Sequence, residues 1–199
     1  MLMRLLTHSI LVIAITAVMS TASQAQPIFD PFGLFRRGAP AERQDMYGGS
    51  YGGSPVTRGV VSYPSGERPG TIVISTGQRR LYYILGNGQA IAYGIGVGRD
   101  GFAWSGVKTV SAKREWPGWT PPREMLRRRP DLPRYMAGGP DNPLGARALY
   151  LGSTLYRIHG SNEPHTIGQA VSSGCFRMTN ADVIDLYNRT RVGAKVIVR

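Results

Sequence analysis

From residue 60 onward, short β-branched and aromatic runs alternate with turns that contain glycine. Residues 71–75 (Thr-Ile-Val-Ile-Ser) form one such run, and residues 80–85 (Arg-Leu-Tyr-Tyr-Ile-Leu) form a second. The Gly-Asn-Gly sequence at 86–88 is typical of a tight hairpin turn, after which residues 89–93 return. The pattern therefore predicts an antiparallel meander over residues 71–93.

The end of the chain carries further strand patterns and one helix pattern. Residues 149–151 and 156–158 are short runs of strand type. Residues 179–182 (Thr-Asn-Ala-Asp) are of the types that begin helices, and apolar positions follow at helical spacing. We expect Gly193 to end this helix and residues 194–198 to form a closing strand. The 26 glycines and 14 prolines fit short strands and many turns better than a helical bundle, so the predicted fold class is mainly β with a short C-terminal helix.

Residues 114–147 differ from the rest, because seven prolines exclude long regular elements there. Trp116 and Trp119 lie in this segment together with a group of arginines. These arginines are Arg123, Arg127, Arg128, Arg129 and Arg134. A loop of this length inside a compact domain is often functional, so we interpret it as a Pro/Arg-rich lid or substrate platform. The alternative is a solvated basic loop whose tryptophans pack into the core.

The first part of the chain is typical of export. A single arginine precedes an apolar run over residues 9–19, and small residues follow up to Ala25. Residues 1–25 are therefore predicted to be a signal peptide that is cleaved after Ala25. The apolar run is shorter than the ~20 residues that cross a bilayer, which disfavours the alternative of an uncleaved membrane anchor, and no stable membrane span is expected after cleavage. Residues 26–58, rich in Gly, Ser and Tyr, are interpreted as a flexible tail or linker, and residues 60–199 as the folded domain.

The net charge indicates which partners the protein binds, and the cysteine content limits the role of its single thiol. The formal net charge is +12, and removal of residues 1–25, whose only charged side chain is Arg4, leaves +11. Such a basic protein favours polyanions, which for an exported protein are cell-wall polymers or anionic lipid head groups. The chain has no recognisable nucleic-acid motif, so nucleic acid is not an expected partner. Cys175 is the only cysteine, so it forms no internal disulfide and is either an inert buried thiol or a reactive one.

One segment contains the residue types that nucleophilic acyl transfer requires. His159 follows a predicted strand, and Cys175 comes sixteen residues later in a Ser/Gly turn before the predicted helix. A thiol attacks as the thiolate, which a neighbouring imidazole promotes. Gly174 would let the backbone turn so that the N–H groups of Gly174 and Cys175 form an oxyanion hole, and Arg177 has a guanidinium suited to a carboxylate. From spacing alone, the alternatives are a strand-end histidine, a small core thiol and a surface charge.

The same segment resembles a known family. The blocks at 159–162 (His-Gly-Ser-Asn), 167–168 (Ile-Gly) and 172–178 (Ser-Ser-Gly-Cys-Phe-Arg-Met) resemble the signature of the L,D-transpeptidases, the group with a YkuD- or ErfK-type catalytic domain. The Trp-Pro-Gly-Trp sequence at 116–119 also resembles members of this family, and the resemblance covers roughly residues 60–199. It implies a β-sandwich catalytic domain in the periplasm that needs no metal and no other cofactor.

The resemblance further implies a reaction on peptidoglycan. Such enzymes cleave the bond after diaminopimelate in a tetrapeptide donor and hold the acyl group as a thioester, which an amine then resolves. The amine comes from a second diaminopimelate, which makes a 3-3 cross-link, from an outer-membrane protein, or from a free D-amino acid. Carbapenems acylate these enzymes. Two alternatives stay open: a hydrolase (an L,D-carboxypeptidase or endopeptidase) with the same site, and a non-catalytic wall-binding module.

Each residue that matches the family signature acquires an implied role. Cys175 is the expected nucleophile and His159 the expected base. Gly160 or Ser161 is expected to orient the imidazole through a backbone carbonyl, and Gly174 to shape the turn. The expected substrate-binding residues are Arg177, Ser172, Ser173, Asn162, Trp116 and Trp119.

The chain departs from the family at one position. Ser173 stands where the family often has a histidine, and a serine cannot carry charge at neutral pH. His159 is therefore the only well-placed imidazole. His165, in the intervening loop, is expected to be an ordinary loop histidine, with contact to the substrate as the alternative.

Overall fold

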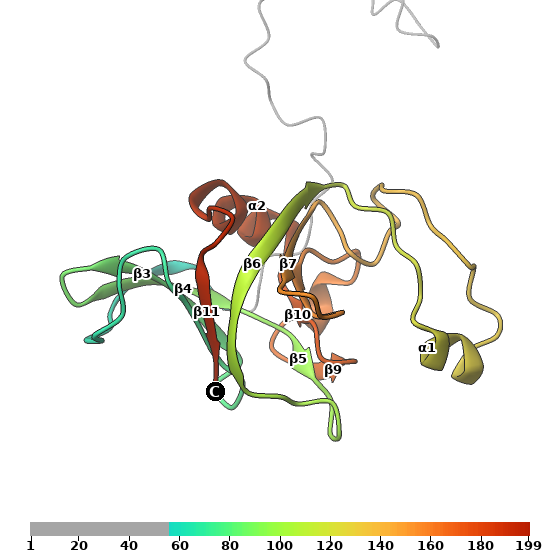
Figure 1. Ribbon diagram of the computed structural model, residues 1–199, viewed down its shortest axis with the longest axis horizontal. Helices are drawn as coiled ribbons and strands as arrows, with labels where there is room; N and C mark the ends of the chain where they lie inside the picture. Colours follow the sequence, from blue (N-terminus) through green and yellow to red (C-terminus); the bar gives the residue numbers. More distant parts are fainter. Residues whose placement is uncertain (1–55) are drawn as a thin grey trace, which may run out of the picture. The chain divides into compact units, whose positions relative to one another are not determined.

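The computed structural model describes residues 56–199, which form a mainly β domain with few short helices (Figure 1). The predicted signal peptide at 1–25 and all but the end of the predicted linker at 26–58 lie outside the described residues. The strands are β1 Gly59–Ser62, β2 Ile72–Ser75, β3 Arg80–Gly86, β4 Gln89–Gly94, β5 Val97–Gly98, β6 Gly106–Glu115, β7 Arg147–Leu151, β8 Arg157–His159, β9 Ala170–Ser172, β10 Phe176–Arg177 and β11 Lys195–Val198. The helices are α1 Arg123–Arg128, α2 Asn180–Arg189 and the 3₁₀ turn η1 Pro164–Thr166. The predicted fold class, mainly β with a short C-terminal helix, is confirmed.

The predicted meander is part of one nine-stranded sheet with the order β1-β4-β3-β2-β11-β6-β7-β8-β10. β3 and β4 form the hairpin around Asn87, whose φ of 51° lies in the left-handed region that Asn tolerates. β2 pairs antiparallel with β3, as the sequence predicted. β1 lies ahead of the meander in the chain and pairs with β4 at the edge of the sheet.

The ten-residue strand β6 joins the two halves of this sheet. Its first half pairs antiparallel with β11, where Lys195 lies opposite Thr109. Its second half pairs with β7, where Val110 lies opposite Leu151, and the register shifts between Val110 and Ala112. Such an irregularity bends a strand, so the sheet divides at β6 into two arms (Figure 1). The two layers of the β-sandwich that the family resemblance implied are therefore the two arms of this one bent sheet.

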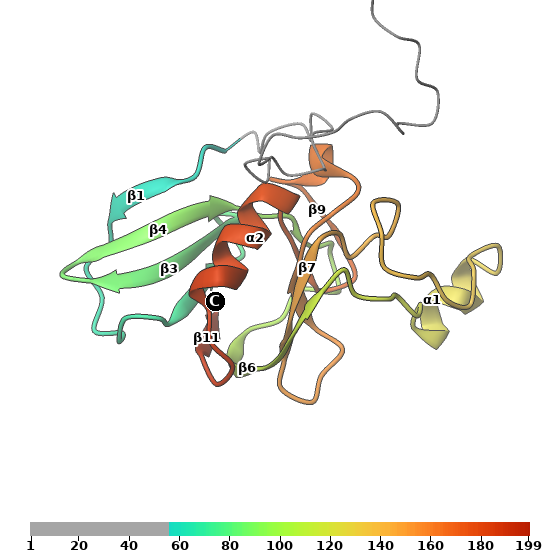
Figure 2. The same cartoon turned by 90° about the horizontal axis from the view of Figure 1, so that it is seen from above.

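Both arms and α2 enclose one apolar core. Ile72 and Tyr93 from the first arm belong to the same buried cluster as Leu149 and Ile158 from the second. α2 adds its apolar face, and Figure 2 shows the helix between the β3–β4 hairpin and β7. Full burial of a large apolar side chain contributes about 1.5–3 kcal/mol. The core therefore fixes the position of β8, which ends at His159.

The helix α2 begins where the sequence predicted but ends before Gly193. Thr179 Oγ1 accepts a hydrogen bond from the Asp182 N–H at 3.2 Å, which caps the first turn. The helix ends at Arg189, because Thr190 already has an extended backbone with ψ at 132°. The expectation that Gly193 ends the helix is wrong. Gly193, with φ at 88°, instead forms the turn into β11.

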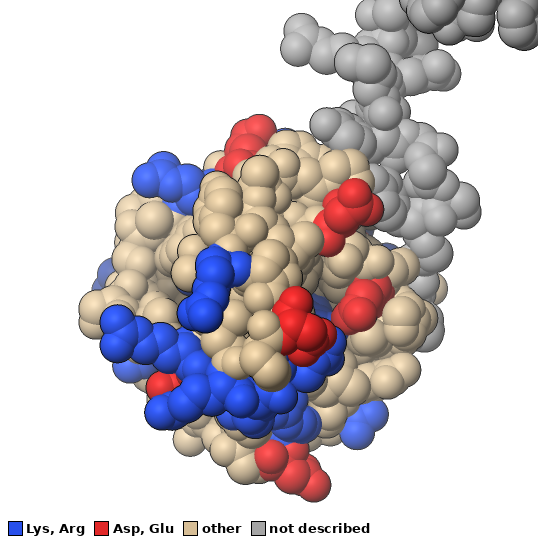
Figure 3. All heavy atoms as spheres, turned by 90° about the vertical axis from the view of Figure 1, so that its right-hand side faces the viewer, with Lys and Arg blue, Asp and Glu red and all other residues tan. Residues whose placement is uncertain are grey.

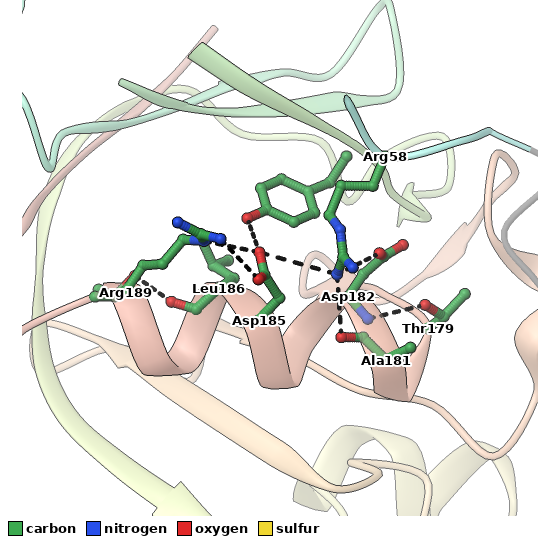
Figure 4. Close-up of polar contacts among 9 residues, drawn as sticks. Arg58, Thr179, Ala181, Asp182, Asp185, Leu186 and Arg189 are labelled. Carbon is green, nitrogen blue, oxygen red and sulfur yellow. Dashed lines mark hydrogen bonds and ion pairs between the residues drawn. The ribbon is translucent and has the colours of Figure 1, made fainter. Parts of the chain in front are cut away.

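A polar network joins the start of the described chain to α2 (Figure 4). Arg58 Nη1 lies 3.3 Å from Asp182 Oδ1 and 3.9 Å from Asp185 Oδ2. The Tyr93 hydroxyl donates to the Asp185 carboxylate at 2.6 Å, and Arg189 forms an i,i+4 ion pair with it. Burial, together with the adjacent Asp185 carboxylate, raises the pKa of Tyr93 far above its ordinary value, so the hydroxyl keeps its proton. Arg58, the last residue of the predicted linker, thus contacts the folded domain.

The Pro/Arg-rich segment between β6 and β7 extends away from the sheet, and we call residues 116–146 the lid (Figure 1). The lid contains α1 and a bridge in which Trp119 and Met136 exchange backbone hydrogen bonds of 2.8 Å. Figure 3 shows lysine and arginine side chains gathered on the face of the molecule that carries the lid. The exposed arginines of the lid are Arg123, Arg127, Arg128, Arg129 and Arg134. Within residues 56–199, no helix has the length and apolar character needed to cross a membrane.

Candidate active site

The pairing of β8 with β10 brings the candidate catalytic residues onto one face. The two strands are parallel, with Phe176 opposite Ile158 and Arg177 opposite His159. Ile158 and Phe176 point into the core and are almost fully buried. Because side chains alternate along a strand, their neighbours in sequence lie on the opposite face. These neighbours are Arg157, His159, Cys175 and Arg177.

All four of these residues line one cavity of about 420 Å³. The lid contributes Trp119, Met125 and Arg128 to the lining, and β9 with the following turn contributes Ser172 and Ser173. The lining combines apolar rings and chains with a few polar groups, which is typical of a site for a small molecule or a peptide. The lid therefore forms one wall of this cavity, and its role as a substrate platform stays a prediction.

His159 is held by the backbone that follows it. Its Nδ1 lies 2.6 Å from the Gly160 carbonyl oxygen, and the side chain is buried. A carbonyl oxygen only accepts hydrogen bonds, so the proton of the neutral ring is on Nδ1 and Nε2 is the basic nitrogen. Burial, followed by the positive charge of Arg177, lowers the pKa of His159 to about 3. The imidazole is therefore neutral at physiological pH and can accept a proton.

Cys175 lies in the turn directly before β10. Its thiol donates to the Leu155 carbonyl oxygen, with 3.6 Å between sulfur and oxygen. Burial raises the pKa of the Cys175 thiol. The backbone N–H of Arg157 and the positive charge of its side chain lower this pKa. The Cys175 thiol and the His159 imidazole, which line the same cavity, are therefore both neutral in the resting site.

The turn that presents Cys175 depends on Gly174 and on two aromatic rings. Gly174 has φ at 102°, and a Cβ atom there would lie 2.6 Å from Cε1 of Tyr156. Trp104 stacks on Tyr156 with 4.6 Å between ring centroids, and its Nε1 donates to the Gly174 carbonyl at 2.9 Å. Only glycine fits this conformation in this space.

The backbone N–H groups of the turn are not equivalent. The Gly174 N–H donates to Ser172 Oγ at 3.1 Å, and that hydroxyl in turn donates to the Cys175 carbonyl at 2.6 Å. The Cys175 N–H has no acceptor among residues 56–199. The sequence suggested that the N–H groups of Gly174 and Cys175 would both be free donors. In this structure the Gly174 N–H is already bonded to the Ser172 hydroxyl. The Cys175 N–H is thus the free candidate for an oxyanion donor.

Arg177 already binds a carboxylate in this structure. Its Nη1 lies 2.8 Å from Glu163 Oε2 and 3.4 Å from Thr166 Oγ1. Arg177 also lines the cavity beside His159. The guanidinium is thus placed where it can hold a carboxylate, and Glu163 currently supplies one.

The remaining predicted residues are not brought to the cavity. The Ser161 hydroxyl is buried and accepts from the Glu163 N–H at 2.9 Å. Asn162 Nδ2 donates to the Asp141 carbonyl at 3.0 Å, which joins the loop after β8 to the lid. Trp116 does not line the cavity. Of the two residues expected to orient the imidazole, Gly160 supplies the carbonyl that contacts His159, and the Asn162 amide contacts the lid.

Several cavity residues escaped the sequence analysis, and Arg157 is the most informative of them. Tyr156, Arg157 and Phe102 line the cavity; the sequence placed Tyr156 and Arg157 only in a strand and gave no signal for Phe102. Alternation along β8 could have found Arg157, because it lies two residues before His159 on the same face. Within the described part of the chain, no group of three His, Cys, Asp or Glu side chains is placed to hold a metal ion.

A β-rich domain with a thiol and an imidazole on one wall of a cavity belongs to the class of cysteine-dependent acyl-transfer domains. The family model of the L,D-transpeptidase catalytic domain, YkuD, matches residues 69–198. The chain therefore belongs to the L,D-transpeptidase family.

Three known proteins illustrate the similarity. A probable L,D-transpeptidase, ErfK/SrfK, from Escherichia coli strain K12 is 40% identical over 134 residues, which are 63% of this chain and 42% of that protein. A crystal structure from Brucella melitensis, described as a probable carnitine operon oxidoreductase, is 46% identical with a TM-score of 0.50 and covers 73% of this chain and 94% of that one. An L,D-transpeptidase structure from Mycobacterium smegmatis has a TM-score of 0.53 at 16% identity, covers 65% of this chain and 58% of that one, and shows the fold alone. The chain spans less than half the length of the first curated relatives that it matches.

Proposed function

We propose that this protein is an L,D-transpeptidase that acts on peptidoglycan stem peptides through a thioester on Cys175. The observation that carries the proposal is the shared face of β8 and β10, which puts Cys175, His159 and Arg177 on one wall of the cavity. Membership of the L,D-transpeptidase family supports the same reaction.

In the first half-reaction, the Cys175 sulfur attacks the carbonyl carbon of the diaminopimelate residue, and the thiol proton passes to His159 Nε2. The Cys175 N–H donates to the carbonyl oxygen as negative charge develops there, and the Gly174 N–H joins it if Ser172 releases it. The C–N bond to the terminal D-amino acid then breaks, and the leaving amine takes the proton from His159. The acyl group stays on sulfur as a thioester.

In the second half-reaction, the acceptor amine attacks the thioester carbonyl and gives its proton to His159. The C–S bond breaks, and the sulfur recovers a proton from the imidazolium. The neutral resting pair suits both steps, because His159 starts each half-reaction with Nε2 free to accept a proton.

The acceptor amine comes from a second diaminopimelate, from an outer-membrane protein or from a free D-amino acid. A 3-3 cross-link, an anchored protein or an exchanged residue is the respective product. The basic face that carries the lid suits the anionic polymers of the wall (Figure 3). With the signal peptide predicted at residues 1–25, this reaction belongs in the periplasm. If water resolves the thioester, the same site is an L,D-carboxypeptidase or endopeptidase.

A carbapenem tests the nucleophile directly. Wild-type protein is expected to gain one covalent adduct, which peptide mapping by mass spectrometry places on Cys175. Cys175→Ala is expected to gain none while it keeps the wild-type circular dichroism spectrum. A folded wild-type protein that gains no adduct would favour the wall-binding module.

Purified sacculi and tetrapeptide muropeptides then identify the product by mass. Wild-type protein is expected to give products with an amine-derived bond, and Cys175→Ala is expected to give none. Release of the terminal residue without a new bond would identify the hydrolase. Transfer activity retained by Cys175→Ala would exclude the thioester mechanism.

A further inference from the structure

The strand β8 presents a second cation to Cys175. Arg157 lies one residue before Ile158, and Cys175 lies one residue before its partner Phe176, so the two side chains are neighbours across the parallel pair. Both line the cavity. The Arg157 guanidinium carbon lies 5.0 Å from the centre of the Tyr150 ring, and Nη1 donates to the Leu155 carbonyl at 3.3 Å. Tyr150 and Leu155 therefore hold the guanidinium in place.

One nitrogen of this guanidinium lacks a partner. Arg157 Nε is buried and has no hydrogen-bond acceptor within residues 56–199. A buried donor left unpaired is destabilising, so the position calls for an acceptor that is missing in the resting state. The neutral Cys175 thiol points its own proton at Leu155 and offers sulfur only as a weak acceptor.

Of the two arginines on β8 and β10, Arg177 is paired with a carboxylate and Arg157, among residues 56–199, is not. Arg177 has its carboxylate partner, Glu163, at 2.8 Å. Arg157 forms no ion pair with any carboxylate in the described part of the chain. Arg157 therefore contributes a positive charge to the cavity wall that no acidic side chain balances.

We infer that Arg157 is a positioning residue that stabilises the Cys175 thiolate through its charge and its unpaired Nε–H. When the thiol proton leaves for His159, the sulfur becomes a strong acceptor, and Arg157 is the neighbouring cation that can donate to it. Arg157 thus supplies the positive charge that Ser173 cannot carry. The inference rests on the proposed function only for the role of Cys175 as nucleophile.

Alkylation tests this inference without a substrate. Cys175 is the only cysteine, so iodoacetamide incorporation followed by mass spectrometry reports its reactivity alone. Rates measured from pH 5 to 10 on the full chain give the apparent pKa of the thiol. The variants are Arg157→Gln, Arg157→Met, which keeps an apolar stem of similar length, and Arg157→Lys. Arg191→Gln, which removes an exposed arginine after α2, is the control for loss of one charge.

Both neutral variants are expected to raise the apparent thiol pKa by about one unit, since an adjacent cation lowers an acidic pKa by ~1–3 units. The rate at pH 7 then falls about threefold to tenfold, while the rate on the alkaline plateau stays equal or rises, because a more basic thiolate is the better nucleophile. Arg157→Lys is expected to lie between these variants and wild type, and Arg191→Gln to match wild type.

A wild-type alkylation profile in a folded Arg157→Gln or Arg157→Met variant would overturn the inference. A rate that rises at every pH would overturn it too, because that pattern reports exposure of the thiol and not loss of charge. If both neutral variants fail to fold, Arg157→Lys decides: the lysine ammonium keeps the charge but lacks the guanidinium Nε–H, so a wild-type pKa in this variant would refute the role assigned to the Nε–H. A shifted profile in a protein that shows no transfer activity would refute the proposed function and leave this inference standing.

Discussion

The buried imidazole of His159 predicts how the stability of the fold depends on pH. In the folded protein its pKa is lowered from 6.5 to about 3. An unfolded chain exposes the imidazole, which then takes up a proton below pH 6.5, whereas the folded protein keeps it neutral down to about pH 3. The contribution of His159 to stability is therefore fully present above pH 6.5 and is lost as the pH falls toward 3.

The magnitude follows from the two pKa values. At pH 4.5 the unfolded imidazole is two pKa units below its midpoint, and each unit corresponds to about 1.36 kcal/mol. Acidification from pH 7.5 to 4.5 is therefore expected to remove about 2.7 kcal/mol of the free energy of unfolding through His159. Urea denaturation at both pH values measures the total loss, which also contains the contributions of other titrating groups.

The variant His159→Gln isolates the contribution of this one group, because Gln does not titrate. Its loss of stability between pH 7.5 and 4.5 is expected to be smaller than that of wild type by about 2–3 kcal/mol. The control is His165→Gln, in which the exposed loop histidine is replaced and the wild-type pH dependence is expected to remain. An equal pH dependence in His159→Gln and wild type would refute the burial of a neutral imidazole.

Three further predictions concern the turn, the lid and the polar network on α2. Gly174→Ala forces alanine into a backbone conformation that costs about 1–3 kcal/mol and brings its Cβ into a steric clash with the Tyr156 ring. The rate of carbapenem acylation is therefore expected to fall sharply, and a wild-type rate would contradict this reasoning. Reversal of charge at Arg127–Arg129 is expected to weaken sedimentation with purified sacculi at low salt, and binding that is unchanged and insensitive to salt would make the lid only a solvated surface. Asp185→Ala leaves the Tyr93 hydroxyl without its carboxylate and is expected to lower the free energy of unfolding by about 1–3 kcal/mol. Urea titration checks this value, and a loss below 0.5 kcal/mol, the usual limit for a surface change, would show that the hydroxyl finds another partner.

The strands predicted correctly from the sequence are those that carry a row of buried apolar side chains. β2, β3 and β4 carry β-branched and aromatic residues around a Gly-Asn-Gly turn, and their pattern predicted the meander. β6 escaped detection because its ten residues are mostly polar or exposed, and Val110 is its one buried residue. Its place between β11 and β7 is fixed by backbone hydrogen bonds, which leave no apolar signature.

The sequence predicted the residues of the site whose chemistry follows from their side-chain type. It did not predict contacts that depend on which residues are neighbours in the folded protein. Cys175 and His159 were proposed from their residue types and spacing, which left alternatives open, and the family signature then implied their roles. Asn162 was assigned to the substrate because of the family signature, yet its amide contacts Asp141 in the lid. Glu163, which pairs with Arg177, gave no signal, because nothing in a single sequence says which carboxylate meets which guanidinium.

The orientation of the whole site depends on the register of one short parallel pair. Side chains alternate along a strand, so a slip of one residue between β8 and β10 would turn Cys175 toward the core and Phe176 toward the cavity. Only two residue pairs define this register, and the burial of Ile158 and Phe176 holds it. The apolar residues Ile158 and Phe176 are thus as necessary for the candidate site as the reactive groups, because their burial decides that Cys175 and His159 face the same cavity.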